Sequence, residues 1–284
     1  MGIRPCWGLL LLCACNAELG HADDASLGLD DNGAGRDGNP QGQWGMPAKV
    51  AGADSTADED DGTLSSTRLE LYFKRVDGTD ANLYVMTRQT PTSAWGMPEP
   101  LTVLNSTVGE ETPRLSPNDL TMYFGRNGDI YMTTRTAVGQ PWGAPTPVTA
   151  LNTTDYEKWA AVCDGGYAIV SRSTTMSSQD LFAGTVDGGA TTALTQLNST
   201  AQDQGAMLTS DCLKLYFQSN RSGTFDLYVA TRASAASDWV DATALVDFNT
   251  ATFSEEDPWM STDQRTFVFA DNAAGNKDIY MSTR

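Results

Sequence analysis

The stretch LTMYFGRNGDIYMTTR at Leu120–Arg135 recurs in varied form along the chain and decides the fold. Its other copies are LELYFKRVDGTDANLYVMTR, YAIVSRSTTMSSQDLFAGTV, LKLYFQSNRSGTFDLYVATR and RTFVFADNAAGNKDIYMSTR, which begin at Leu69, Tyr167, Leu213 and Arg265. An interval of about 50 residues, with apolar alternation and Gly, Asn and Asp turns, is typical of a propeller blade. The sequence therefore predicts an all-β propeller with one blade for each copy.

A further segment, usually with Trp and Pro, precedes each copy and suits the outermost strand, since an edge strand tolerates Pro. Four of these segments keep the Trp, and Gly188–Leu197 lacks it: Trp44–Val50, Trp95–Leu104, Trp142–Leu151 and Trp239–Val246. The first segment has no inner strands before it, and the last copy ends at Arg284 with no edge strand after it. We therefore expect a five-bladed β-propeller of four-stranded antiparallel blades, closed by the N-terminal edge strand.

The composition excludes several classes of function. The 284 residues carry a net charge of −18 and contain no basic stripe, so we expect no nucleic-acid partner. His21 is the only histidine, and it lies in the acidic N-terminal part of the chain. A Ser-His-Asp triad, a Cys-His pair and a His-based metal site are therefore excluded from the repeats, and only carboxylate chemistry remains.

The N-terminal residues predict export. Residues 1–15, MGIRPCWGLLLLCAC, have one Arg, a short apolar run and small residues, as in a signal peptide. The end of this run resembles the lipobox of bacterial lipoproteins, which would make Cys15 the lipidated residue; an ordinary cleaved signal is the alternative. Residues 16–43 are rich in Gly and Asp and predict a flexible acidic tether to a propeller domain at 44–284. We expect an exported, outer membrane-anchored lipoprotein that faces the periplasm or the cell surface.

The stretch SPNDLTMYFGRNGDIYMTTR at Ser116–Arg135 resembles the WD40-like propeller repeat of the TolB family and of many exported bacterial lipoproteins. The resemblance covers roughly residues 44–284 and implies a propeller used for binding. TolB-like proteins have six blades and an added N-terminal domain, whereas this chain predicts five blades.

One set of polar residues is a candidate site. Counting back by one fixed offset from the second strand of each copy gives a residue that opens the innermost strand: Asp60, Glu111, Glu157, Gln204 and Glu256. Because that strand lines the channel of a propeller, we expect these residues to ring one mouth, with Arg114, Trp159 and Trp259 beside them. Acids next to aromatic side chains suit a sugar, an amine or a cationic peptide. The alternative is that each acid only braces neighbouring blades, as repeated residues often do.

Two cysteines, Cys163 and Cys212, lie in the inner hairpins of adjacent blades. Export makes a disulfide chemically possible. Neighbouring hairpins can nevertheless lie too far apart, because Cα atoms more than about 7 Å apart cannot be joined without backbone movement. We therefore expect two separate thiols rather than a bridge.

The main functional hypothesis is a monomeric binding module for a protein, peptide or other component of the cell envelope, without cofactor or metal. The alternative is a carboxylate-dependent glycoside hydrolase or a glycan-binding propeller, since arabinanase-like glycosidases are also five-bladed with acids in the channel. Such an enzyme needs two carboxyl groups about 5–9.5 Å apart around a sugar-sized pocket. A third, weaker hypothesis is a propeller stabilised by calcium alone.

Overall fold

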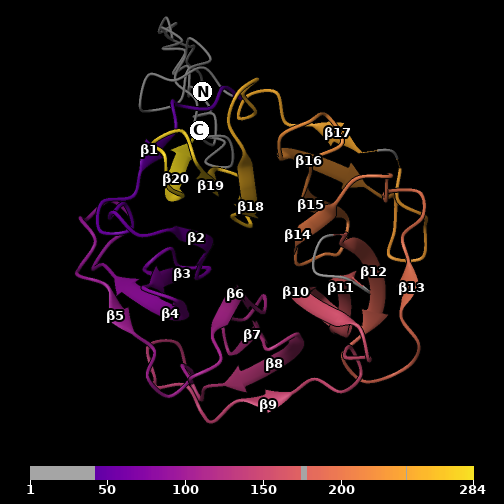
Figure 1. The fold of residues 1–284 in the computed structure, drawn as a ribbon, viewed down its shortest axis with the longest axis horizontal. Coiled ribbons are helices and arrows are strands. Elements are labelled where there is room, and N and C mark those ends of the chain that lie inside the picture. The colour runs from indigo at the N-terminus through magenta and orange to yellow at the C-terminus, as the bar shows by residue number, and fades with distance from the viewer. Residues whose placement is uncertain (1–41, 174–177, 241) are drawn as a thin grey trace, which may run out of the picture. The chain divides into compact units, whose positions relative to one another are not determined.

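The computed structural model describes residues 42–173, 178–240 and 242–284, and these form a ring of five four-stranded antiparallel sheets (Figure 1). The fold predicted from the repeats is confirmed. Cys15, the predicted signal and nearly all of the predicted tether lie outside the described residues. No helix among the described residues combines the length and hydropathy that crossing a membrane would require.

Each sheet is one blade, with its strands in chain order from the channel outward in the first four blades. Blade one is β2 (Glu59–Leu64), β3 (Glu70–Asp77), β4 (Asp80–Thr87) and β5 (Glu99–Pro100). Blade two is β6 (Glu110–Leu115), β7 (Thr121–Arg126), β8 (Asp129–Thr134) and β9 (Thr146–Pro147). Blade three is β10 (Tyr156–Val162), β11 (Tyr167–Ser173), β12 (Asp180–Thr185) and β13 (Thr192–Ala193), with a 3-10 turn at Asp164–Gly166.

Blade four is β14 (Asp203–Leu208), β15 (Lys214–Ser219), β16 (Asp226–Thr231) and β17 (Thr243–Ala244). Blade five takes strands from both ends of the described chain: β18 (Glu255–Met260), β19 (Thr266–Asp271), β20 (Asp278–Thr283) and β1 (Ala48–Lys49). Ala48 pairs with Met281, and Lys49 pairs with Tyr280. The predicted closure by the N-terminal edge strand is confirmed, and Figure 1 shows β1 beside β20.

The core of each blade is built from the repeated aromatic residues. In four blades, a buried Phe of the second strand stacks on a Tyr of the third strand with ring centroids 5.7–6.1 Å apart: Phe73–Tyr84, Phe124–Tyr131, Phe217–Tyr228 and Phe269–Tyr280. In blade three, Val170 faces Phe182 at the same place. Such pairs contribute about 0.5–1.5 kcal/mol beyond the area that they bury.

The Trp residues of the outer segments anchor the ends of the third strands. A strand-ending Arg stacks over one Trp in each of four blades: Arg88 on Trp95, Arg135 on Trp142, Arg232 on Trp239 and Arg284 on Trp44. Arg135 also reaches the neighbouring blade, where its guanidinium contacts Glu70 at 2.8 Å and the Tyr72 hydroxyl at 3.0 Å. These Arg residues therefore hold the outer Trp segments against the ends of the third strands, and Arg135 also links two blades.

Candidate functional site

The innermost strands β2, β6, β10, β14 and β18 surround the channel (Figure 1), and the backbone fixes which of their residues are equivalent. In blade one, Glu59 pairs with Arg75, and Asp60 pairs with Lys74, before a bulge. In blade three, Glu157 pairs with Arg172, so Glu157 is equivalent to Glu59 rather than to Asp60. The residues at the position of Asp60 are thus Asp60, Glu111, Lys158, Gln204 and Glu256.

The sequence-based alignment therefore placed Glu157 one residue out of register. The hairpin after β10 is one residue shorter than the hairpin after β2, because Val162 pairs with Ala168 whereas Leu64 pairs with Leu71. Counting back from the second strand by the offset that suits blade one therefore reaches Glu157, which lies one residue before the equivalent position in β10. A lysine, Lys158, stands in the ring where the sequence predicted an acid.

Glu157 belongs to a second set of acids that brace their own blades. In four blades, the carboxylate forms an ion pair with an Arg of the same blade, which lies two residues after the core position of the second strand in the first three blades and four residues after it in blade four: Glu59–Arg75, Glu110–Arg126, Glu157–Arg172 and Asp203–Arg221. The side chain of Glu157 is fully buried, and its distance to Arg172 is 2.6 Å. It also accepts hydrogen bonds from the backbone and hydroxyl of Thr153. Glu157 thus braces blade three.

Blade five breaks this pattern. Glu255 pairs in register with a second acid, Asp271, whereas the equivalent residue pairs with an Arg in the first three blades and with Ser219 in blade four. Burial raises the pKa of Glu255 to about 7, with Asp271 and Asp226 adding to the shift, against hydrogen bonds from Thr250. The folded protein therefore holds this proton more tightly than the unfolded chain does.

We predict a pH dependence from this carboxyl group. The contribution of Glu255 to stability should be complete below about pH 4.5, the ordinary value for Glu, and should be lost as the pH rises through about 7. Glu255→Gln should remove this slope, so the melting temperature of the wild type minus that of the variant should fall between pH 4.5 and 7. Thermal unfolding of both proteins at constant ionic strength measures this difference. Parallel curves would contradict the assignment.

At the start of the innermost strands, which we call the carboxylate end of the channel, three buried acids meet. One carboxylate oxygen from each of Asp60, Asp61 and Asp257 lies within 4.8 Å of the others. The Lys74 ammonium lies 2.8 Å from Asp60 and 3.7 Å from Asp61, and Lys277 lies 3.4 Å from Asp60. The acids are therefore neutralised by lysines of the same chain.

The rest of the carboxylate end is also paired. Glu256 contacts Lys277 and the Gln218 amide, each at 2.9 Å. Glu111 contacts Lys158 at 2.9 Å and accepts a hydrogen bond from the Tyr156 hydroxyl at 3.0 Å.

The indole of Trp159 contacts two of the three buried acids at the carboxylate end. Its indole N–H lies 3.1 Å from Asp61 Oδ1 and 3.2 Å from Asp257 Oδ1, and the ring is almost fully buried. Lys158 lies over the Trp159 ring, 4.4 Å from its centroid. Trp159 is therefore a structural donor to the buried carboxylates rather than an exposed platform for a sugar.

Burial and neighbouring charges shift the pKa values of Asp61 and Asp257 in opposite directions. Burial alone would raise the pKa of Asp61, but Lys74 and Lys158 outweigh it and hold that pKa below its ordinary value. Burial raises the pKa of Asp257 well above its ordinary value, and the charges of Asp61 and Asp60 add to the shift. The neutral form is therefore favoured more at Asp257 than at Asp61.

The three carboxyl groups resemble a donor set for a hard cation, but their surroundings fit one poorly. Calcium takes six to eight oxygen ligands in proteins. At Asp60 those ligand positions are already taken by the ammonium groups of Lys74 and Lys277, and the raised pKa of Asp257 disfavours its charged form as a ligand. We assign no metal to this cluster. The four residues that neutralise or complete it were missed by the sequence analysis: Lys74, Lys277, Asp61 and Asp257.

The other end of the channel, which we call the hairpin end, has an apolar inner wall and a rim of polar hairpin residues: Ser66, Ser116, Asp119, Thr209, Ser210, Asp211, Thr262 and Gln264. It is framed by the last residue of each innermost strand: Leu64, Leu115, Val162, Leu208 and Met260. A cavity of about 110 Å³ opens there, and Met207 and Trp259 also line it. A second cavity of about 30 Å³, lined by Arg114 and Thr63, lies deeper among the same strands. Arg114 and Trp259, expected beside the acids, thus line cavities toward the hairpin end.

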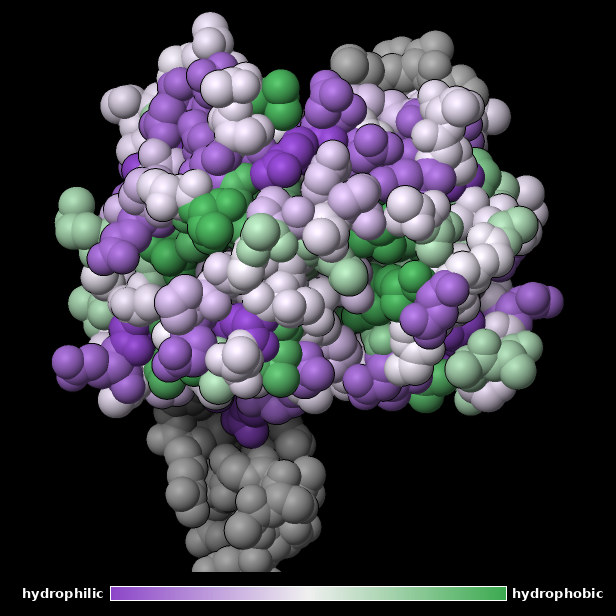
Figure 2. Space-filling view, turned by 90° about the horizontal axis from the view of Figure 1, so that it is seen from below, coloured by the Kyte–Doolittle hydropathy of each residue, from purple (hydrophilic) through white to green (hydrophobic). Residues whose placement is uncertain are grey.

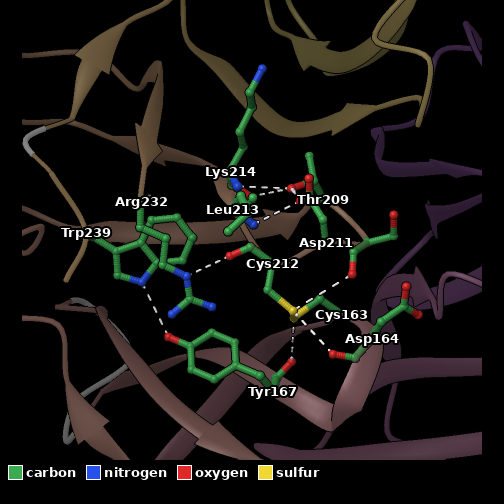
Figure 3. Close-up of a disulfide and its surroundings, with 11 residues drawn as sticks. Cys163, Asp164, Tyr167, Thr209, Asp211, Cys212, Leu213, Lys214, Arg232 and Trp239 are labelled. Atoms are coloured by element: carbon green, nitrogen blue, oxygen red, sulfur yellow. Dashed lines mark hydrogen bonds between the residues drawn. A yellow bond between two sulfur atoms is a disulfide. The ribbon is translucent and has the colours of Figure 1, made fainter. Parts of the chain in front are cut away.

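Cys163 and Cys212 form a disulfide at the hairpin end, so the prediction of two separate thiols is wrong (Figure 3). Their Cα atoms are 5.4 Å apart, within the range that a disulfide spans. The two hairpins touch directly, because the Asp164 N–H donates to the Ser210 carbonyl at 2.9 Å. The disulfide therefore joins blades three and four at this end of the channel.

Comparisons with known proteins agree with the fold. No protein-family model matches the chain, and no curated protein matches it in sequence. Among solved structures, one described as TolB of Agrobacterium tumefaciens is 15% identical, with a TM-score of 0.50, covering 79% of this chain and 76% of that one. An α-L-arabinofuranosidase of Podospora anserina in complex with cellotriose is 13% identical, with a TM-score of 0.58, covering 83% and 94%. The GH62 α-L-arabinofuranosidase catalytic domain of Coprinopsis cinerea is 13% identical, with a TM-score of 0.56, covering 85% and 96%.

These similarities are too low in identity to carry more than architecture. The chain has the fold of a five-bladed β-propeller, and TolB and arabinofuranosidase structures share parts of that fold. Fold alone does not transfer an activity, so function must be argued from the two ends of the channel.

Proposed function

We propose that this propeller is a binding module of the cell envelope, which takes a peptide or protein segment at the hairpin end of its channel. The observation that carries the proposal is the contrast between the two ends. The carboxylates are buried and paired with lysines of the same chain, whereas the hairpin end has an open cavity with an apolar inner wall and a polar rim. The export signal predicted from residues 1–15 supports the location.

The geometry argues against a glycoside hydrolase at the carboxylate end. Hydrolysis needs an acid and a base or nucleophile about 5–9.5 Å apart on either side of a sugar. Here oxygens of Asp60, Asp61 and Asp257 crowd within 4.8 Å, and all three side chains are almost fully buried. A sugar could reach them only by displacing Lys74 and Lys277.

The cavity at the hairpin end has the size of one apolar side chain. Its volume is about 110 Å³, whereas a cavity of about 150 Å³ binds benzene. Leu115 and Met207 are half-buried in its wall, so apolar surface remains for a ligand to cover. By contrast, on the side of the propeller seen in Figure 2, apolar side chains lie in separate patches among hydrophilic ones. We therefore place the ligand at the channel and give it an apolar anchor residue.

Selection of peptides from a displayed random library tests this proposal. Selected peptides should bind the wild type and Leu115→Met alike, because that change conserves volume. Leu115→Glu should weaken binding at least about tenfold, since it places a charge against the apolar anchor. Glu111→Gln, at the carboxylate end, should leave the affinity unchanged. Loss of binding in Glu111→Gln but not in Leu115→Glu would place the site at the carboxylate end, and release of sugar from a polysaccharide would show an enzyme.

A second candidate, recognition of a carboxylated glycan, is favoured by the seam between blades four and five. Between blades one and two, Glu70 and Arg135 close the equivalent place with an ion pair. Between blades four and five, those positions hold Lys214 and Arg284, which are both cations. These two cations cannot pair with each other; Lys214 instead donates to Gln264 Oε1 across the seam at 2.5 Å, and Arg284 Nε donates to the Gln264 carbonyl at 2.7 Å.

A cavity of about 310 Å³ lies at this seam, lined by Lys214, Arg284 and the acid Asp247, with the aromatic residues Trp44, Tyr216 and Phe248. Two cations beside aromatic side chains suit a sugar that bears a carboxylate. A glycan array with uronic-acid and neutral sugars compares this candidate with the peptide hypothesis. Binding to uronic acids that is lost in Lys214→Glu and kept in Leu115→Glu would favour the glycan.

A further inference from the structure

One level of the channel, between its two ends, is unlike the others. The residues there share one register position, opposite the residue before the core position of the second strand: Thr63, Arg114, Ala161, Met207 and Trp259. A single cation, one hydroxyl and a small Ala therefore meet two large apolar side chains. Ala161 leaves space that a larger residue would fill, and the cavity of about 30 Å³ lies at this level.

Arg114 is buried at this level without a counterion in contact. Its side chain is 3% exposed, and its Nη1 donates to the carbonyls of Asp61 and Pro113, each at 3.2 Å. Its Nε reaches the Ala206 carbonyl at 3.5 Å. Within the described part of the chain, Arg114 makes no ion pair, and its Nη2 has no hydrogen-bond partner.

Thr63 adds a second unused donor to the same cavity. Its side chain is 1% exposed, and among the described residues its Oγ1 has no partner either. Both groups line the cavity of about 30 Å³. Leaving a buried hydroxyl unpaired is destabilising, and an uncompensated buried charge is more destabilising still. Burial lowers the pKa of Arg114, against the charges of Asp257, Asp61 and Asp60, which agrees with an incompletely compensated guanidinium.

We propose that Arg114 Nη2 and Thr63 Oγ1 bind a small monovalent anion inside the channel. The guanidinium can only donate hydrogen bonds, and the Thr63 hydroxyl is free to donate, so the occupant must accept both. Water needs about 10–15 Å³ of such space, so a cavity of about 30 Å³ admits one small ion and excludes a large one. The anion has two possible sources: a dissolved halide, or a carboxylate carried into the channel by a ligand at the hairpin end.

This inference stands apart from the proposed function, because a halide would satisfy Arg114 in a protein that binds no peptide. The acids of the carboxylate end do not replace the anion. Asp61 offers Arg114 its backbone carbonyl while its carboxylate faces Thr112 N and the Trp159 indole. Burial raises the pKa of Asp257, which favours its neutral form and weakens its repulsion of an anion.

Bromide in crystals of the full-length protein tests the site directly. We expect an anomalous peak within hydrogen-bond distance of Arg114 Nη2 and Thr63 Oγ1 in the wild type, and no peak there in Arg114→Met. The matched control, Arg265→Met, removes an exposed guanidinium and should keep the peak. Water density alone at Arg114, or bromide only elsewhere, would overturn the proposal.

Thermal unfolding in different sodium salts at equal ionic strength tests it in solution. Chloride or bromide should raise the melting temperature of the wild type above its value in gluconate, whose anion is too large for the cavity. Above the Kd, each tenfold rise in halide should add on the order of 4 °C.

Arg114→Met should lose this dependence, Thr63→Val should weaken it, and Arg265→Met should keep it. Stabilisation by formate as well as halide would show that the site accepts a carboxylate, whereas stabilisation by halide alone would identify a dissolved ion. Equal melting temperatures in halide, formate and gluconate would overturn the proposal.

Discussion

Replacing Lys74 with Met is expected to lower the free energy of unfolding by about 3–5 kcal/mol, the usual cost of removing one partner of a buried ion pair. The Lys74 ammonium lies 2.8 Å from Asp60 and 3.7 Å from Asp61, and all three side chains are almost fully buried. Lys277 would remain near Asp60, but Asp61 would lose its ion-pair partner. Denaturant unfolding of the wild type and the variant measures the difference.

Two controls separate the buried charge from the loss of the side chain. The double variant Lys74→Met/Asp60→Asn should recover part of the loss, because one unpaired acid becomes neutral. Arg68→Met, which removes a surface pair with Asp263 at 3.3 Å, should cost no more than about 1 kcal/mol. If Lys74→Met cost as little as Arg68→Met, the neutralised carboxylate end would not be a feature of the folded protein.

Replacing both Cys163 and Cys212 with Ser is expected to lower the free energy of unfolding by about 2–4 kcal/mol. The two residues are 49 apart in sequence, so the disulfide closes a long loop and restricts the conformations of the unfolded chain. It also holds the hairpins of blades three and four together at the hairpin end of the channel. Denaturant unfolding with and without a thiol reductant measures this contribution.

A reductant should destabilise the wild type by the same amount and leave the Ser variant unchanged. Alkylation followed by mass spectrometry of the purified protein should find both cysteines protected until reduction. Two freely alkylated thiols in the untreated protein would contradict the disulfide and restore the expectation drawn from the sequence.

The architecture could be predicted because the same sequence pattern recurs in every blade. The Phe–Tyr stacks recur at an interval set by the four-stranded blade, so five copies indicate five blades. Ring closure followed from counting strands: the orphan segment at Trp44–Val50 had only one free edge to join, and β1 pairs with β20. These conclusions need only local pattern and chain connectivity.

The site could be predicted only in part, because it depends on register and on side chains from other strands. One missing residue in the hairpin after β10 moved Glu157 away from the channel position and put Lys158 there. The partners of Asp60 come from β3 and from the turn before β20, at sequence distances that no single repeat reveals. The sequence showed a row of acids, and only the structure shows that lysines neutralise them.

The disulfide was missed for a related reason. Sequence placed Cys163 and Cys212 in adjacent hairpins, but whether two hairpins touch depends on how tightly the blades pack around the channel. The hydrogen bond from Asp164 to Ser210 shows that they do. Cys15 and the predicted signal lie outside the described residues, so lipid anchoring remains a prediction.

Footprinting of a bound ligand by hydroxyl radicals tests the central claim most directly, because each channel end has a half-buried, oxidisable residue. Met207 lines the cavity of the hairpin end, and Tyr156 lies at the carboxylate end beside Glu111. With a selected peptide bound to the wild type, oxidation of Met207 should fall while oxidation of Tyr156 stays unchanged. Protection of Tyr156 with Met207 still oxidised would contradict the account and return the site to the carboxylates.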